Sequence, residues 1–468
     1  MKASHPARLM VTVGAKPRAQ PERREAPRRV RARARVELAI AAALLGLGLL
    51  VLRPGMALLG VAALPIVTLR LAGVAVGGMR RRSQVGLPPR RGRRAGVARA
   101  RRAADVVTAA AVMAIVLSLA SYGGALGSRS NSSLGIRSVE WLRDNGAAWL
   151  VSDVERLYYS ITAPAKGGPA LRQLPTVGLT SPRLVPTYRL PHSAAPPKGI
   201  APVIAPALPG EGAWRATQDR FSSLGEAPLL VTTYRPDPTY PRVVAGVARI
   251  NPRRAVVALY PGIRVPPGGA SMQSAGEVPP PLRRRLLATF NGGFNPADYA
   301  GGFYTGGRLL EAMRPGLATL VGTTSGRVDV RTWHGGSRPG RNIVFARQNL
   351  PLIVADGRPN PGLSGGREWG TTVGNTTLVW RSGVGVDRHG NLLYAAASYR
   401  TVQGLADILV HAGAIRAMEL DINSYWVTFN VFGQRGARSP SKLLGGMDRP
   451  ATRYLAPDDR DFFAVYAR

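Results

Sequence analysis

Hydrophobic residues follow two different patterns along the chain. Over the first 127 residues they form three long runs, at 36–52, 56–79 and 104–127. A helix needs about 20 apolar residues to cross a bilayer, so each run has about the length of a membrane span. A secretory signal peptide has one short apolar run before its cleavage site, which does not account for three. The pattern predicts three transmembrane helices.

Basic residues beside these runs predict the topology. Residues 1–35 contain 11 Lys and Arg without apolar periodicity, and residues 80–102 contain ten Arg and no acidic residue. Positive segments next to membrane spans stay on the cytoplasmic side. The disordered tail at 1–35 and the loop at 80–102 share that side if the first two spans form a hairpin. We therefore expect a multi-pass protein of the cell membrane whose chain beyond residue 128 is extracytoplasmic.

Two connecting segments follow the third run. Residues 128–160 place apolar residues at helical spacing, which predicts an amphipathic juxtamembrane segment of short helices. Residues 161–212 are rich in proline and poor in acids, which is typical of an extended spacer. The composition changes again at about residue 213, where we place the start of a folded domain.

Between residues 213 and 468, apolar residues come in short runs separated by glycine, which predicts strands. One run, Val402–His411, has helical spacing instead, with Thr401 as its N-cap. Many strands and few helices indicate an α+β domain with a mostly antiparallel or mixed sheet, preceded by the N-terminal transmembrane helices. The predicted strands are Pro228–Thr233, Val243–Ile250, Val256–Tyr260, Leu286–Phe290, Arg327–Trp333, Pro351–Val354, Thr377–Arg381, Leu392–Ala397, Met418–Asp421 and Phe462–Tyr466.

Composition narrows the classes of partner. The chain has 63 basic and 26 acidic residues, a net charge of +37, and no cysteine. The absence of cysteine excludes disulfides, thiolate metal sites and cysteine nucleophiles. The densest basic runs flank the predicted spans, so topology explains them better than nucleic-acid binding does, and we expect no nucleic-acid partner. Arg outnumbers Lys by 58 to 5, which indicates a GC-rich, actinobacterial genome. The remaining charge favours an anionic ligand.

Three short motifs in the 213–468 domain combine glycine with polar side chains. Asn291-Gly292-Gly293-Phe294 ends a predicted strand, where glycine lets a ligand approach the backbone and the Asn amide can bind sugar hydroxyls. Asp356 begins an Asp-Gly turn after another strand, and Arg381 lies on a glycine-bracketed strand. The planar guanidinium of Arg381 suits a phosphate. An ordinary turn or a solvated surface charge would give the same motifs.

The strongest candidate is the strand that contains Glu419 and Asp421. In a regular strand Glu419, Asp421 and Asn423 point to one face, about 7 Å apart. Glycosidic cleavage uses two carboxylates, one as acid and one as base or nucleophile. The same oxygens would also suit Ca²⁺ or Mg²⁺, and the pattern also fits the solvent-facing edge of a half-buried strand. Trp426 lies beside them, either to stack on a sugar ring or to pack in the core.

In this order the four motifs resemble the phosphodiester glycosidase domain family, which includes N-acetylglucosamine-1-phosphodiester alpha-N-acetylglucosaminidase and bacterial exopolysaccharide-associated proteins. The resemblance covers about residues 250–468. One position departs from the family pattern, because a glycine-rich loop usually follows the Leu-Asp pair and this chain has Ile422-Asn423-Ser424 instead. The matching segments are Asn291–Phe294, Asp356-Gly357, Arg381–Gly385, Gly404–Gly413 and Leu420-Asp421.

The resemblance implies a membrane-anchored extracytoplasmic hydrolase that cleaves sugar-1-phosphodiester bonds in anionic cell-envelope glycans. Asp421 is then the essential carboxylate with Glu419 as its partner, and Arg381 holds the phosphate. The resemblance leaves the metal undefined, and Ca²⁺ or Mg²⁺ stays open. The altered loop supports a second hypothesis, a non-catalytic glycan-binding or scaffolding domain on the same fold. The expected substrate-binding residues are Asn291, Gly292, Gly293, Phe294, Arg381, Asp356, Asn423 and Trp426.

Overall fold

The computed structural model describes residues 91–147, 149, 151, 159, 163–168, 171–175, 197–218, 227–272, 275–296, 298–299, 301–365, 367–371, 377–434 and 437–468, with only the backbone for 91–107. The tail at 1–35 and the spans predicted at 36–52 and 56–79 lie outside the described residues. The chain divides into two compact units, Met1–Ser118 and Leu119–Arg468.

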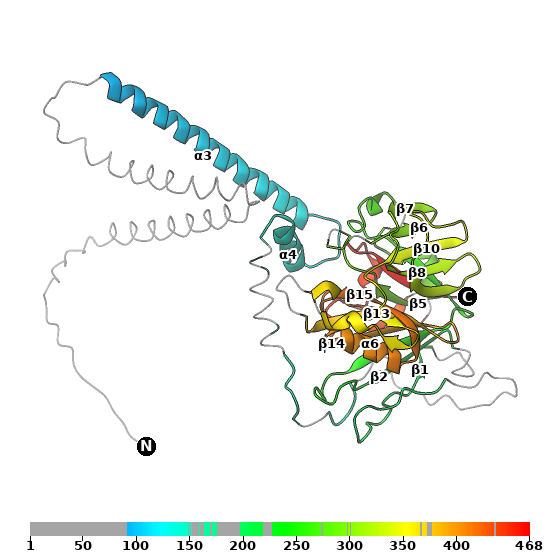
Figure 1. Cartoon of the computed structure of the whole chain (residues 1–468). Coiled ribbons are helices and arrows are strands. Elements are labelled where there is room, and N and C mark those ends of the chain that lie inside the picture. The colour runs from blue at the N-terminus through cyan, green and yellow to red at the C-terminus, as the bar shows by residue number, and fades with distance from the viewer. Residues whose placement is uncertain are drawn as a thin grey trace, which may run out of the picture. The chain divides into compact units, whose positions relative to one another are not determined.

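A long helix, α3 (Arg91–Leu126), contains the third predicted span (Figure 1). Its stretch Thr108–Leu126 is 19 residues long with a mean hydropathy of 1.8, which is long and apolar enough to cross a membrane. Large apolar side chains on this stretch, such as Leu117 and Leu119, are more than half exposed. An anchor helix and a signal sequence would both show this character.

A short helix, α4 (Leu134–Asp144), follows α3 within the second unit. Ser133 is its N-cap, and the Ser133 hydroxyl accepts a hydrogen bond from the Ile136 amide, which satisfies one of the free amides of the first turn. The helix falls in the segment predicted to be amphipathic. Trp141 donates from its indole nitrogen to the Ser121 hydroxyl over 3.1 Å, so α4 packs beside the end of α3.

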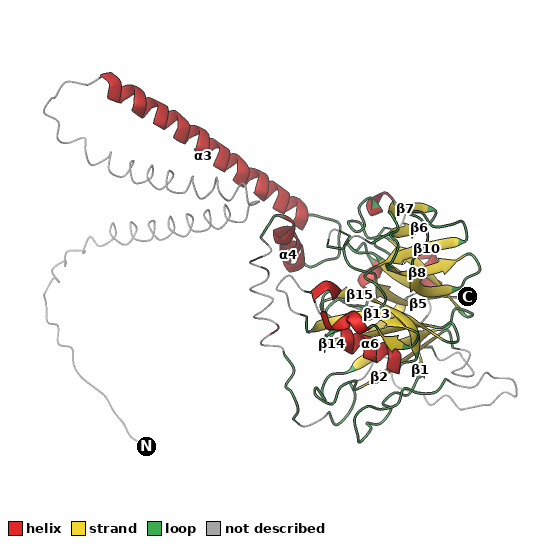
Figure 2. Ribbon diagram, viewed as in Figure 1, coloured by secondary structure: helices red, strands yellow, loops and turns green. Residues whose placement is uncertain are grey.

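Three antiparallel sheets form the body of the second unit (Figures 1 and 2). Within the described residues, the first sheet has the order β1 (Arg215–Ala216), β2 (Leu229–Tyr234), β3 (Ala245–Ile250), β14 (Leu392–Arg400), β13 (Val379–Asp387), β15 (Ala414–Ile422), β11 (Val354–Ala355) and β12 (Arg358–Pro359). The second sheet is β7 (Arg308–Glu311), β6 (Phe303–Thr305), β10 (Ile343–Gln348), β8 (Ala318–Thr323) and β9 (Val328–Thr332). The third is β17 (Arg438–Lys442), β16 (Phe429–Gln434), β5 (Leu286–Asn291), β18 (Phe462–Ala467) and β4 (Ala255–Tyr260).

Every described strand pair is antiparallel, which resolves the predicted choice between an antiparallel and a mixed sheet. A tight hairpin turn follows β13. The Asp387 carboxylate accepts hydrogen bonds from the His389 and Asn391 amides, and this turn joins β13 to β14. Such local side-chain bonds are the reason that Asp favours turns.

Helices are few, as predicted. The predicted helix is α6 (Val402–His411), and the Thr401 hydroxyl caps it by accepting from the Gly404 amide over 3.2 Å. Its buried face, which includes Leu405 and Leu409, packs on the first sheet. The described part of the chain also has short 3₁₀ helices at Gly269–Ser271, Pro280–Arg285, Pro361–Gly365, Arg367–Trp369 and Arg453–Leu455.

Two differences from the predicted elements have local causes. The strand predicted at Pro351–Val354 is only the short β11, because Pro351 has no amide to donate to a ladder. The spacer predicted at 161–212 is packed at its end. The Ile200 amide donates to Gly212, and Glu211 forms a buried ion pair with Arg235 at 2.8 Å. The folded structure therefore begins before residue 213.

The main core lies where the three sheets meet. Buried side chains of all three sheets form one cluster, including Phe290 of β5, Leu320 of β8 and Leu420 of β15. A second cluster lies between the first sheet and α6. Because β15 borders both clusters, its side chains are packed on both faces, and this packing fixes the position of its two acids.

Candidate active site

Glu419 and Asp421 lie near the end of β15. Met418 and Leu420 belong to the main core, and Glu419 points to the opposite face of the strand. The pairing of β15 with β13 shifts register between Glu419 and Ile422, and this irregularity interrupts the alternation that was expected to place Asp421 on the face of Glu419. Glu419 is fully buried and Asp421 is 6% exposed. The strand ends at Ile422, so Asn423 does not continue the strand as the regular-strand expectation required.

Glu419 is held by an arginine of the neighbouring strand. Arg381 Nη1 donates to Glu419 Oε1 over 2.5 Å, while Glu419 Oε2 is buried without a hydrogen-bond partner. Burial raises the pKa of Glu419 to about 7, and the Arg381 charge only partly offsets that rise. A carboxyl group with such a pKa exchanges its proton near neutral pH, which suits acid–base chemistry.

Arg381 has no N–H group left for a phosphate in this structure. Its side chain is fully buried, and its five N–H groups donate to Glu419 and to four backbone carbonyls, those of Arg400, Trp369, Gly370 and Thr377. These contacts tie β13 to the loop before it. Arg381 therefore holds Glu419 and the surrounding backbone, and the phosphate-holding role expected for it would require one of these bonds to break.

Asp421 pairs with a second arginine, Arg460, which the sequence analysis did not identify. Arg460 Nη2 donates to Asp421 Oδ2 over 3.1 Å, and the Ile422 amide donates to Asp421 Oδ1. Arg460 Nε and Nη1 are buried and have no hydrogen-bond partner among the residues that the structure describes. The guanidinium lies 4.5 Å from the centre of the Trp426 ring. Burial raises the pKa of Asp421 to about 6, against the lowering effect of Arg460.

The residues after β15 form a tight turn. Asn423 has a φ of 77°, a left-handed conformation that Asn tolerates better than most residues. Its side-chain oxygen accepts from the Tyr425 amide over 3.1 Å. This turn stands where the glycine-rich loop was expected, and it brings Trp426 against Arg460. Trp426 is thus placed at the site, with a cation as its stacking partner in this structure.

Asn291 is part of the framework that supports the site. Its amide nitrogen donates to the Gly292 carbonyl and the Ser382 hydroxyl, each over 3.0 Å. Its amide oxygen accepts from the Tyr394 hydroxyl and the Thr428 amide. The side chain is 2% exposed, and these four bonds use its full capacity. Asn291 therefore joins neighbouring strands in this structure, in place of the sugar contact expected for it.

Gly292 and Gly293 allow a buried ion pair to pack against the end of β5. A Cβ atom on Gly292 would lie 1.9 Å from Asp461 Oδ2, and one on Gly293 would lie 3.2 Å from the Arg347 guanidinium carbon. Arg347 and Asp461 pair at 2.8 Å. The Asp421 amide donates to the Gly292 carbonyl, so this glycine also positions the candidate carboxylate.

Of the remaining predicted residues, Phe294 lies near the site and Asp356 lies far from it. Phe294 is buried close to Gly370 and belongs to the same core cluster as Ile422, the residue that follows Asp421. Asp356 is exposed in the turn between β11 and β12, where the Gly357 amide donates to Ile415. Ile415 is at the opposite end of β15 from Asp421, about 20 Å along the strand. Asp356 follows β11, which pairs with this far end of β15, so Asp356 is not part of the site.

A covering segment, residues 130–144, lies against this centre. The Ser130 and Ser132 hydroxyls both donate to Asp459 Oδ2, over 2.6 and 3.1 Å. Arg449 donates to the Ser132 hydroxyl and to the Tyr425 hydroxyl, at 3.2 and 2.6 Å. Side chains from before α4 thus bind to the loop that follows β15 and to the loop that precedes β18.

The covering segment also places an acid beside Arg460. Glu140 of α4 is 7% exposed. Burial raises the pKa of Glu140, and the positive charge of Arg460 is the largest effect that opposes this rise. Arg143 of α4 lies 3.6 Å from Asp298. The arginine that binds Asp421 therefore also faces α4, and Asp421 has little contact with solvent.

Neither carboxylate of β15 lies in a metal-binding cluster. In the part of the chain that the structure describes, no three His, Cys, Asp or Glu side chains gather as metal ligands. The charges of Glu419 and Asp421 are each balanced by an arginine, at 2.5 and 3.1 Å. A divalent cation at this place would have to displace one of these guanidinium groups.

Several of the residues missed by the sequence analysis come from one short run, Asp458-Asp459-Arg460-Asp461. Three of its side chains are ion-paired: Asp458 with Arg453 and Arg449, Arg460 with Asp421, and Asp461 with Arg347. Three acids within four residues are unusual in a chain with a net charge of +37, and that contrast was an available signal.

The structure is similar in fold to solved structures at low sequence identity. One is the catalytic domain of zebrafish N-acetylglucosamine-1-phosphodiester alpha-N-acetylglucosaminidase, auto-inhibited by its pro-peptide, at 17% identity and a TM-score of 0.36, covering 55% of this chain and 87% of that one. A hypothetical protein from Synechocystis matches at 14% identity and a TM-score of 0.31, over 51% of this chain and 62% of that chain.

A putative exported protein from Burkholderia pseudomallei matches at 15% identity and a TM-score of 0.27, over 50% of this chain and 75% of that chain. The sequence matches no protein-family model and no curated protein. The match to a phosphodiester glycosidase catalytic domain is therefore a distant one of fold, and the candidate site rests on the contacts within this chain.

Proposed function

We propose that this protein is a membrane-anchored hydrolase that cleaves sugar-1-phosphodiester bonds in cell-envelope glycans. The observation that carries the proposal is the pair formed by Asp421 and Arg460. A nearly buried carboxylate with a raised pKa lies beside a guanidinium that still has two nitrogens without partners. Such a pair offers a base and an anion-binding group within one hydrogen bond of each other.

In this reaction Asp421 acts on the attacking water, and Arg460 acts on the departing phosphate. A water molecule gives a proton to Asp421 as its oxygen bonds to the anomeric carbon of the sugar. The bond between that carbon and the phosphate oxygen breaks, and its electron pair leaves with the phosphate. The free N–H groups of Arg460 balance the charge on the departing phosphomonoester. Glu419, whose pKa is about 7, takes the role of the second carboxylate that holds or returns a proton.

The substrate reaches this site only when the covering segment moves. In this structure Asp421 is 6% exposed, and residues 130–144 lie against Arg460 and Asp459. Only Gly127, Ser128 and Arg129 separate the apolar stretch of α3 from Ser130. If α3 is inserted in a membrane, this short connection keeps the site close to the lipid surface, where envelope glycans are anchored. The multi-pass topology and the extracytoplasmic side remain part of this proposal.

A second candidate is a glycan-binding or scaffolding domain without catalysis. Glu419 is fully buried and Arg381 uses all its N–H groups within the protein, which are properties of a structural ion pair. Fold alone does not decide between the two functions. Hydrolysis of a substrate does, because a binding domain releases no sugar.

The test uses the full chain in detergent with a panel of sugar-1-phosphodiesters, each assayed with and without Ca²⁺ or Mg²⁺. We expect release of free sugar by the wild type and a loss of about 10²–10⁴ in rate for Asp421→Asn. Asp407→Asn is the matched control, since Asp407 is an exposed carboxylate on α6. Glycan binding without any sugar release would support the second candidate and refute the first.

A further inference from the structure

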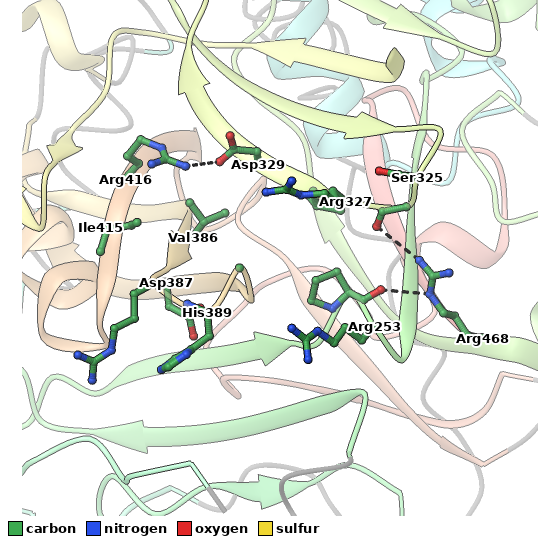
Figure 3. A pocket seen from close by; sticks show the side chains of 15 residues that line it. Arg253, Ser325, Arg327, Asp329, Val386, Asp387, His389, Ile415, Arg416 and Arg468 are labelled. Carbon is green, nitrogen blue, oxygen red and sulfur yellow. Dashed lines mark hydrogen bonds and ion pairs between the residues drawn. The ribbon is translucent and has the colours of Figure 1, made fainter. Parts of the chain in front are cut away.

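A cavity of about 570 Å³ lies at the far end of β15 from Asp421 (Figure 3). It is lined by Ile415 and Arg416 at the start of β15 and by the turns that follow β3, β8 and β13. Asp421 lies five positions further along the strand than Arg416, which corresponds to about 16 Å. The cavity is therefore distinct from the candidate active site, and the ends of all three sheets contribute to it.

Positive charge dominates the lining of this cavity. Five arginines line it, together with the acids Asp329 and Asp387. Arg416 pairs with Asp329 at 2.5 Å, and Asp387 is used by its own turn and by Arg249 at 3.7 Å. Both acids are thus already engaged. The five arginines are Arg253, Arg327, Arg388, Arg416 and Arg468.

Four of these arginines have no carboxylate partner. Among the described residues, the guanidinium groups of Arg253, Arg327 and Arg388 have neither a hydrogen bond nor an ion pair. Arg468 donates only to the backbone carbonyls of Pro252, Ala255 and Gly326. Figure 3 shows Arg253 and Arg327 directed into the open space that His389 borders on its other side. Like charges that converge on one space repel each other, and a bound anion removes that repulsion.

The size of the cavity and the residues that line it indicate which class of anion would bind there. Arginine forks bind phosphate oxygens two at a time, and the spread of four guanidiniums suits several phosphate groups better than one. Single-stranded nucleic acids bind by stacking bases on aromatic rings. No Phe, Tyr or Trp is among the residues that line this cavity. The lining thus favours a phosphate chain without bases.

We propose that this cavity binds phosphate groups of an anionic polymer without bases, of the polyphosphate or polyol-phosphate class. The site is independent of the hydrolysis proposed for Asp421. It would hold a polymer against the protein at a place remote from the candidate active site.

The test measures binding of fluorescently labelled polyphosphate and of poly(glycerol phosphate) to the full chain in detergent. The variant Arg253→Gln with Arg327→Gln removes two unpaired guanidiniums from the cavity. Two lost charge-assisted contacts weaken binding about tenfold or more. The matched control is Arg338→Gln with Arg438→Gln, which removes equal charge from exposed positions outside the lining. We expect the control to bind within about twofold of the wild type, because screening limits distant charges.

Each outcome decides the proposal. Weaker binding in the cavity variant alone supports it, and the polymer that binds more tightly names the source of the phosphate groups. Equal loss in the two double variants would show diffuse attraction to a basic surface and overturn it. Tighter binding of a polyuridine oligonucleotide of equal charge would also overturn it. Asp421→Asn should bind like the wild type whether or not the protein hydrolyses glycans, so the two proposals fail separately.

Discussion

Arg460 donates one hydrogen bond to Asp421 over 3.1 Å and leaves its other two nitrogens, Nε and Nη1, without a partner among the described residues. Buried N–H groups without partners are rare, because each costs free energy that a ligand can recover. The pair is therefore the place where we propose that an anionic substrate binds. Asp421 comes from the end of β15 and Arg460 from just before β18, so two sheets build the site.

Replacing Arg460 should change the pH dependence of turnover as well as its rate. The Arg460 charge holds down the pKa of Asp421, which burial has raised to about 6. Arg460→Gln removes that charge, so the acidic limb of the pH–rate profile should move to higher pH while the maximal rate falls. Arg460→Lys keeps the charge, so the acidic limb of its pH–rate profile should stay close to that of the wild type. Identical profiles for all three proteins would show that Arg460 does not act on the catalytic carboxylate.

Stability should fall as pH rises through the range set by the two carboxylates. The folded state raises the pKa of Asp421 from 3.8 to about 6 and that of Glu419 from 4.5 to about 7. A raised pKa means that the folded state binds the proton more tightly than the unfolded state. The stabilisation is complete below about pH 4 and is lost as pH rises through about 6 to 7. Melting temperatures between pH 4 and 8 check this, and the slope should flatten in Asp421→Asn and Glu419→Gln.

The buried pair of Arg381 and Glu419 should show strong coupling. Arg381→Met leaves Glu419 buried without a counter-charge and also frees four backbone carbonyls. Removing one partner of a buried ion pair typically costs about 3–5 kcal/mol. Adding Glu419→Gln should recover part of that loss, and the difference is measurable by denaturant unfolding in a double-mutant cycle. Simple additivity of the two changes would contradict the pairing.

Weakening the covering segment should increase turnover. Asn131 and Ser132 both accept hydrogen bonds from Arg449, and Ser132 also donates to Asp459. Asn131→Ala with Ser132→Ala removes these contacts and should raise the rate several-fold, since access to Asp421 then requires fewer broken bonds. Leu134→Ala is the control, because Leu134 is 62% exposed in the same segment. An unchanged rate in a folded double variant would show that this segment does not limit access.

The sequence predicted the parts of the fold that periodicity determines. All ten expected strands overlap strands of the structure, and several, such as those that became β5 and β18, have a similar extent, whereas those expected at Thr377–Arg381 and Met418–Asp421 cover only part of β13 and β15. The helix at Val402–His411 was found with its cap. Two of the missed strands, β8 and β16, carry Gly or Asn within an apolar run, which hides the alternation.

The site was predicted only in part, because its partners are distant in the sequence. Glu419 and Asp421 were found from their spacing along one strand. Their arginines, Arg381 and Arg460, come from different strands and loops, and the spacing of the acids contains no information about them. The bonds of Asn291 could not be predicted for the same reason. Its four bonding partners lie up to 137 residues away, and only the folded chain shows that they exhaust its amide.

The most direct test of the central claim is to follow which bond of a sugar-1-phosphodiester breaks. The full chain is incubated with the substrate in ¹⁸O-labelled water, and phosphorus NMR and mass spectrometry locate the label. The account predicts that ¹⁸O enters the sugar at its anomeric carbon and that the released phosphomonoester has none, with Asp421→Asn slowing the release by about 10²–10⁴. Label on phosphorus would show attack at the phosphate, and full activity of Asp421→Asn would show that Asp421 is not the base. Either result would contradict the account.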